Sequence, residues 1–142
     1  MNNASLIVAS CLAMVLLTGA VGLRLLLNRM TEMREKRIHP QAASTSVQMA
    51  AKLQNVQAAD NFRNLFEVPV LFYALCATAL ALKHVPSWLV LGAGLFVALR
   101  VAHSFIHCTY NKVMHRFPVF MLGFFVVVVL WVAFFITLPH AI

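Results

Sequence analysis

The sequence contains few charged residues, and acidic residues are the scarcest of them. Only 11% of the 142 residues are charged and just four are Asp or Glu, whereas 62% are hydrophobic. Mean hydropathy is +0.86. A soluble domain is about 25% charged and about 45–50% apolar. This composition therefore excludes an ordinary soluble domain and indicates that lipid surrounds most of the chain.

Cysteine is also scarce, and its positions do not predict a metal site. Cys11, Cys76 and Cys108 lie in or at the end of apolar runs, and no pair has metal-ligand spacing. We expect three small, buried, unpaired residues. His103 and His107 are spaced like a metal-binding pair, but zinc needs three or four ligands, and no carboxylate or thiolate obviously converges with them. We therefore expect no metal.

The start of the chain lacks the charge pattern of a cleaved signal peptide. No Lys or Arg precedes the first apolar run, which is longer than the 7–15 residues typical of a signal sequence. We expect this run to be a retained helix.

The chain also lacks an internal repeat, so a small transporter subunit has little support.

Four apolar stretches approach the ~20 residues that a helix needs to cross a bilayer. They are residues 6–27, 65–82, 88–107 and 118–138. Short connections between four spans leave no room for a separate soluble domain. The sequence therefore predicts an all-α, integral membrane four-helix bundle, with residues 1–142 forming a single domain.

Positive charge is concentrated on one side of this predicted bundle. Of the 11 Lys and Arg residues, only Lys83 lies near the second connection, and the others lie in or beside the first and third. The positive-inside rule places those two connections in the cytoplasm and both termini outside, which in a bacterial inner membrane means the periplasm. Membrane lipids are expected partners, and no basic soluble surface exists to bind nucleic acid.

The residues between the spans predict further helical detail. Residues 46–60 are rich in helix formers without Pro or Gly, so we expect one helix that continues into the second span. Pro69 should kink that span. We expect the third span to continue toward Tyr110, and Pro118 to lie in the first turn of the fourth. Arg116 then lies in a short loop.

Two polar stripes interrupt the apolar runs. They are Asp60, Arg63, Asn64 and Glu67 in one, and Arg100, His103, His107 and Tyr110 in the other. Glu67 and Arg100 are the acid and base placed deepest, so we predict an ion pair between them. That pair could simply fix helix register, and snorkelling alone could explain Arg63 and Asn64.

The combination of these residues also predicts a ligand site. Arg63, Arg116 and Arg24 come from three helix ends on one side, next to the polar residues Asn64, His103, Ser104 and His107. We expect them to share a crevice at the cytoplasmic leaflet. Guanidinium groups hold carboxylates bidentately, so this crevice suits a small carboxylate-bearing ligand together with a lipophilic small molecule.

The order of these motifs resembles the MAPEG superfamily, the membrane-associated proteins in eicosanoid and glutathione metabolism. The resemblance rests on the sequence from Asn61 to Glu67, then Pro69, then the segment Arg100 to His103, and finally Arg116 before the last apolar helix. It covers nearly the whole chain. Members include microsomal glutathione transferases, leukotriene C4 synthase and microsomal prostaglandin E synthase.

The resemblance implies a homotrimer that binds glutathione as co-substrate between neighbouring subunits. By position, Arg63, Asn64 and Glu67 contact glutathione, and Arg100 and His103 support them. His107 falls where several members place a ligand-contacting tyrosine. Arg116 matches the arginine proposed to stabilise the glutathione thiolate, the nucleophilic form of the thiol.

The chain departs from the family pattern at two positions. Asp60 and Gly22 occupy places where eicosanoid-type members tend to carry arginines, and Arg24 lies two residues beyond the second. Two functions therefore remain open. One is a glutathione or small-thiol transferase or peroxidase acting on lipophilic electrophiles, and the other is a non-catalytic MAPEG-fold protein that binds a lipid or an acidic metabolite between subunits.

Overall fold

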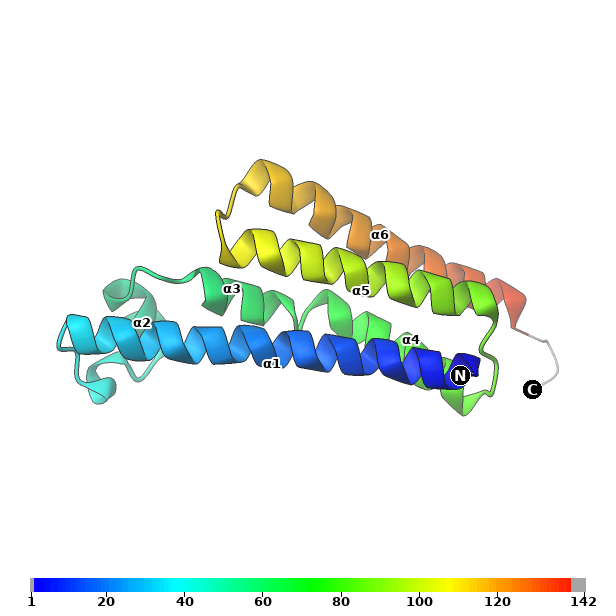
Figure 1. Ribbon diagram of the computed structural model, residues 1–142, viewed down its shortest axis with the longest axis horizontal. Helices are drawn as coiled ribbons and strands as arrows, with labels where there is room; N and C mark the ends of the chain where they lie inside the picture. The colour runs from blue at the N-terminus through cyan, green and yellow to red at the C-terminus, as the bar shows by residue number, and fades with distance from the viewer. Residues whose placement is uncertain (1, 139–142) are drawn as a thin grey trace.

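The computed structural model describes residues 2–138, and the elements in that range are helices. They are α1 (Asn3–Glu35), the short 3₁₀ helix η1 (Pro40–Ala43), α2 (Ser46–Lys52), α3 (Gln57–Asn64), α4 (Val68–Ala81), α5 (Ser87–Cys108) and α6 (Val113–Thr137). Four segments can cross a bilayer: α1, α3 together with α4, α5, and α6 (Figure 1). The predicted all-α, four-span membrane fold is confirmed for these residues. Residues 1 and 139–142 of the predicted domain lie outside the described part.

The first helix is longer than a bilayer requires. Its 33 residues extend about 50 Å at the usual helical rise, whereas the hydrocarbon layer is about 30 Å thick. The Asn2 side chain caps its start by accepting the Ser5 backbone N–H at 2.8 Å. Asn3 donates to the Val85 carbonyl at 2.9 Å, which ties this end to the α4–α5 turn. The extra length therefore projects at the other end, beyond the α5–α6 turn (Figure 1).

The prediction of one helix over residues 46–60 is wrong, because the chain is irregular between α2 and α3. The Glu32 carboxylate of α1 accepts the backbone N–H groups of Gln54 at 2.6 Å and Asn55 at 3.1 Å. It also binds the Lys36 ammonium at 2.6 Å. Since these N–H groups are satisfied without a helix, a contact with α1 overrides the local preference for helix.

Pro69 interrupts the second span, as predicted. α3 ends at Asn64, α4 begins at Val68, and Pro69 occupies the second position of α4. A proline lacks the backbone N–H and its ring clashes with the carbonyl four residues earlier, here that of Leu65. The interruption leaves Glu67 in the turn between the two helices.

The last two spans differ from the prediction at their shared turn. α5 ends two residues short of Tyr110, and α6 begins at Val113, five residues before Pro118. Asn111 adopts a positive φ of 48°, which turns the chain within a short connection. The predictions that Pro118 lies in the first turn of the last helix and that Arg116 lies in a loop are therefore wrong. Arg116 is on α6.

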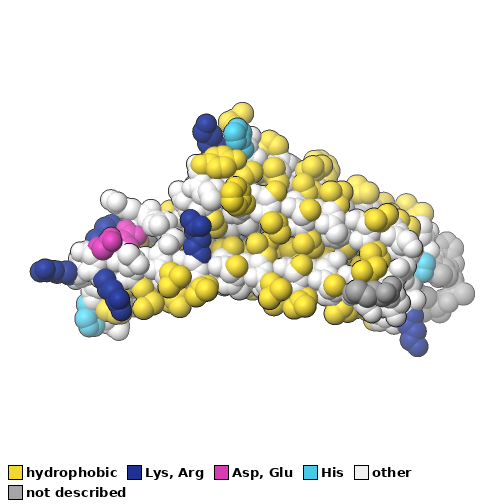
Figure 2. All heavy atoms as spheres, in the orientation of Figure 1, with side chains coloured by type: hydrophobic (Ala, Val, Ile, Leu, Met, Phe, Trp, Pro, Cys, Tyr) yellow, Lys and Arg dark blue, Asp and Glu magenta, His cyan; other side chains and the backbone are white. Residues whose placement is uncertain are grey.

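The bundle core lies where α1, α4, α5 and α6 meet. Phe72 of α4 stacks on Phe96 of α5 with ring centroids 4.6 Å apart, and Trp131 of α6 donates to the Leu71 carbonyl of α4 at 3.0 Å. The three cysteines are free thiols, and Cys76 and Cys108 are buried as predicted, whereas Cys11 is only half-buried. Figure 2 shows hydrophobic side chains along the flank of the bundle, with Lys and Arg gathered at the end that holds α2 and at the α5–α6 turn.

Candidate functional site

A row of polar side chains is buried along one face of α5. Its members are Arg100, His103, Ser104 and His107, each at most 3% exposed. Asn61 of α3 is fully buried and links two turns of α5. It accepts a hydrogen bond from the Ser104 hydroxyl at 3.4 Å, and its amide donates to Cys108 Sγ at 3.3 Å. The predicted stripe of Arg100, His103 and His107 is therefore confirmed as one face of α5, while exposed Tyr110 lies beyond the helix.

The Arg100 guanidinium lies between aromatic rings. Its Cζ atom is 5.3 Å from the Phe96 ring centroid and 4.9 Å from that of Phe120. A Cβ atom at Gly123 would lie 3.4 Å from Arg100 Nη2, so glycine on α6 leaves room for the guanidinium. Neither Nη1 nor Nη2 has a hydrogen-bond partner among residues 2–138.

The predicted ion pair between Glu67 and Arg100 is wrong. Glu67 is exposed in the turn after α3, and Arg100 has no carboxylate within 4.0 Å in the described chain. The reason is the interruption at Pro69, because Glu67 no longer follows the helical stripe that begins at Asp60. The deepest acid and the deepest base thus occupy different environments.

The two histidines continue the buried row toward the end of α5. Their rings pack edge to face with centroids 5.5 Å apart, and His103 also packs against Phe120 at 5.6 Å. Both ring nitrogens of His103, and Nδ1 of His107, are buried without a hydrogen-bond partner in the part of the chain that is described. Together with Arg100 they form a buried polar cluster, which we call the α5 cluster, and its unpartnered nitrogens are exceptions to the rule that buried polar groups are hydrogen-bonded.

The other predicted site residues face outward. The Arg63 side chain is 67% exposed and lies 3.8 Å from the carboxylate of Asp60, which is 52% exposed. Asn64 is half-buried and Glu67 is exposed. A single chain does not bring these residues into the one crevice that the sequence predicted, because Arg63 and Glu67 face the surroundings while His103 is enclosed. The inward face of α3 is instead the face that carries Asn61.

Arg24 and Arg116 lie at the same end of the bundle but have different neighbours. Arg24 of α1 donates a hydrogen bond to the Cys108 carbonyl, and so caps the last turn of α5. Arg116 Nη1 donates to Asn111 Oδ1 at 2.6 Å in the α5–α6 turn. Both guanidinium groups thus stabilise the end of α5, and Arg116 is half-buried.

One buried residue that contacts this row, Asn61, was not among the predicted site residues. The sequence held a signal for Asn61, because Ala58, Asn61 and Leu65 share one helical face and the structure buries all three. An asparagine between two apolar residues on one face predicts a buried amide. The signal was obscured because Arg63 and Asn64 suggested that the neighbouring face was the functional one.

Two largely apolar grooves flank α1. One, of about 360 Å³, lies between α1 and α5, and Arg24, Ser104 and Thr109 provide its polar groups. The other, of about 600 Å³, lies between α1 and the interrupted second span; Gly19, Gly22, Phe62 and Tyr73 line part of it. Both volumes are in the range of small-molecule sites. The second groove opens beside the turn that carries Glu67, since Leu65 and Phe66 also line it.

A comparison with family models covers nearly the whole chain, including nearly all of the four spans. The model of the MAPEG family matches residues 4–136. The chain belongs to the MAPEG family. No match was found among curated proteins or among solved structures. Membership connects this MAPEG protein with the membrane proteins of glutathione and eicosanoid metabolism, and it agrees with the integral, multi-pass membrane placement of the four spans.

Proposed function

We propose that this MAPEG protein is a homotrimeric enzyme that transfers glutathione, or a similar small thiol, to lipophilic electrophiles or hydroperoxides at the cytoplasmic leaflet. The active site lies between neighbouring subunits. Arg63, Asn64 and Glu67 contact the thiol ligand, while Arg100, His103 and His107 supply the polar interior behind it. Arg24 lies at the same end of the bundle as these residues and adds positive charge there, and Arg116 stabilises the thiolate.

The single observation that carries this proposal is the exposure of Glu67. This carboxylate falls inside the second apolar run and faces outward in a single chain. A charge exposed to hydrocarbon costs about 3 kcal/mol or more. A neighbouring subunit and a polar ligand remove that cost, since the glutathione ammonium can pair with Glu67 and a glutathione carboxylate with Arg63.

The chemistry requires the thiol to lose its proton. A guanidinium near the sulfur favours the thiolate, and Arg116, near the start of α6, supplies it while the thiol proton passes to water. The sulfur then forms a bond to the electrophilic carbon of an aryl halide, and the halide leaves with the bonding electron pair. The apolar grooves beside α1 provide surfaces for the lipophilic partner.

Calorimetric titration of glutathione into detergent-solubilised protein tests the proposal, together with a conjugation assay on a model aryl halide. We expect saturable binding and turnover at millimolar thiol. Glu67→Gln should weaken binding about 10–100-fold, the worth of one charge-assisted hydrogen bond. Arg116→Ala should abolish the ultraviolet absorbance of the bound thiolate. Lys112→Gln, an exposed cation at the same turn, is the matched control and should change neither.

The ion pair between Asp60 and Arg63 favours the second candidate, a non-catalytic protein that binds a lipid or an acidic metabolite between subunits. Asp60 partly neutralises Arg63 and repels anions. Mass spectrometry of the purified protein separates the two candidates. A stoichiometric co-purified lipid, together with no heat on adding glutathione, would support the second candidate and contradict the first.

A further inference from the structure

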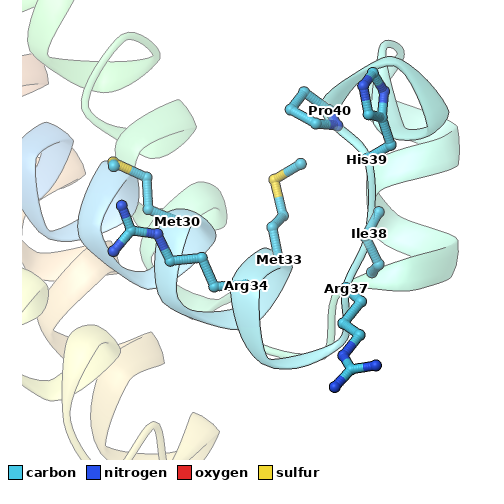
Figure 3. Close-up of a pocket in the computed structure, with 7 residues that line it drawn as sticks. All are labelled: Met30, Met33, Arg34, Arg37, Ile38, His39 and Pro40. Carbon is cyan, nitrogen blue, oxygen red and sulfur yellow. The ribbon is translucent and has the colours of Figure 1, made fainter.

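The end of α1 forms a pocket that the proposed thiol chemistry does not use. It has a volume of about 480 Å³, and its apolar walls are Met30, Met33, Ile38 and Pro40. Figure 3 shows Met33 pointing from α1 toward Pro40 in the segment that follows. A hydrogen bond of 2.9 Å from the Ile38 N–H to the Met33 carbonyl folds this segment back on the helix. The walls are therefore held by the backbone.

The rim of this pocket is basic. Arg34, Arg37 and His39 complete its lining, and Arg34 and Arg37 extend to its two sides in Figure 3. Neither arginine has a carboxylate within 4.0 Å in residues 2–138. Lys36 differs, because it is bound to Glu32. Glu35 is the acid nearest in sequence, but it is not among the residues that line the pocket, so cations outnumber acids at the rim.

The pocket lies at the depth of lipid headgroups. The first apolar run ends at Leu27, and Met30 and Met33 are three and six residues further along α1. At the helical rise of about 1.5 Å per residue they lie ~5 and ~9 Å beyond the hydrocarbon boundary. A headgroup layer is about 5–8 Å thick on each side of a bilayer. Met30 therefore lies within the headgroup layer and Met33 at its outer edge, where the long arginine side chains of the rim can reach the phospholipid phosphates.

We propose that this pocket binds an anionic phospholipid of the leaflet on the α2 side. The rim arginines attract the phosphate, which a guanidinium group can hold bidentately, and Met30, the wall residue closest to the hydrocarbon, contacts the glycerol and the start of the acyl chain. Apolar walls without the rim would suit any lipid, and a rim without the walls would suit free phosphate. Their combination selects a phospholipid with negative charge.

Native mass spectrometry of the full-length protein in detergent, titrated with phosphatidylglycerol or with phosphatidylcholine of the same acyl chains, tests this site. We expect phosphatidylglycerol to bind at least tenfold more tightly. Arg34→Gln with Arg37→Gln should weaken its binding about 30-fold, or about fivefold for each arginine. Met30→Ser should weaken both lipids similarly, because it alters only the wall.

Two further variants guard against indirect effects. Arg34→Lys with Arg37→Lys should keep most of the preference, and Lys112→Gln, which removes an exposed cation from the other basic connection, should keep all of it. Equal binding of the two lipids by the wild type would overturn the proposal. So would an unchanged preference in the double glutamine variant, or displacement of the lipid by millimolar inorganic phosphate, which would indicate a site for free phosphate.

Discussion

Replacing Arg100 with methionine tests whether the α5 cluster is maintained at a cost in stability. The guanidinium is 1% exposed, and neither terminal nitrogen has a hydrogen-bond partner within the described residues. Methionine has a similar length and can occupy the space between Phe96 and Phe120. We therefore expect Arg100→Met to stabilise the folded protein while weakening thiol binding.

The magnitude follows from two opposing contributions. A charge this deep in a span costs about 3 kcal/mol or more, and the two cation–π contacts return about 1 kcal/mol each. The difference is about 1 kcal/mol in favour of methionine, in line with the gain of about 1–4 kcal/mol when buried ionic groups are replaced by apolar ones. For a chain of this length it corresponds to a rise of about 2–4 °C in melting temperature.

The assay is thermal unfolding in detergent, followed by circular dichroism, with Arg24→Met as the matched variant. Arg24 caps α5 through the Cys108 carbonyl, so its loss should lower the melting temperature by a few degrees. A fall of several degrees in Arg100→Met would refute the reasoning, because it would mean that Arg100 has a stabilising partner in the folded protein.

Two other predictions concern helix packing and the first connection. A Cβ atom on Gly92 would overlap Leu130 Cδ2, whereas one on Gly94 meets nothing within 4 Å. Gly92→Ala should therefore destabilise the α5–α6 contact by about 1–3 kcal/mol, and Gly94→Ala should not. Equal unfolding curves for the two variants would contradict this packing. Glu32 lies five residues beyond the first apolar run. The pKa of its carboxyl is lowered from 4.5 to about 2, mainly by the hydrogen bond from the Gln54 backbone N–H and secondly by that from Lys36. Because the folded-state pKa is the lower one, the stabilising contribution of Glu32 is complete above pH ~4.5 and is lost as the pH falls toward 2. Hydrogen-exchange protection of the Gln54 and Asn55 amides should fall over that range, and Glu32→Ala, which has no acceptor, should lack this protection at every pH.

The sequence predicted the spans well because their signal is local. An apolar run of about 20 residues has few alternatives to a membrane helix, and a proline usually interrupts a helix, as Pro69 does here. The start of α6 was harder to predict, because α6 begins at Val113 and keeps Pro118 inside the helix, where proline is disfavoured. The connection after α2 depended on Glu32, a residue more than 20 positions away in the sequence.

The candidate site was predicted only in part, because only part of its signal is local in the sequence. The spacing of Arg100, His103 and His107 fixes one face of α5, so their common burial followed from the pattern. The partner of Arg100 did not follow from it, because complementary charge suggested Glu67, and only the turn before α4 shows that this carboxylate faces outward. Sequence can pair charges by sign, but the direction of a side chain after a helix break depends on the fold.

The most direct test of the proposed function is an electron cryo-microscopy map of the protein in a lipid nanodisc with millimolar glutathione. We predict density between neighbouring subunits on the outer face of α3, in contact with Arg63, Asn64 and Glu67 and with its sulfur near an Arg116 guanidinium. A map with that surface covered by acyl chains, or with Glu67 facing lipid and no glutathione bound, would contradict the account.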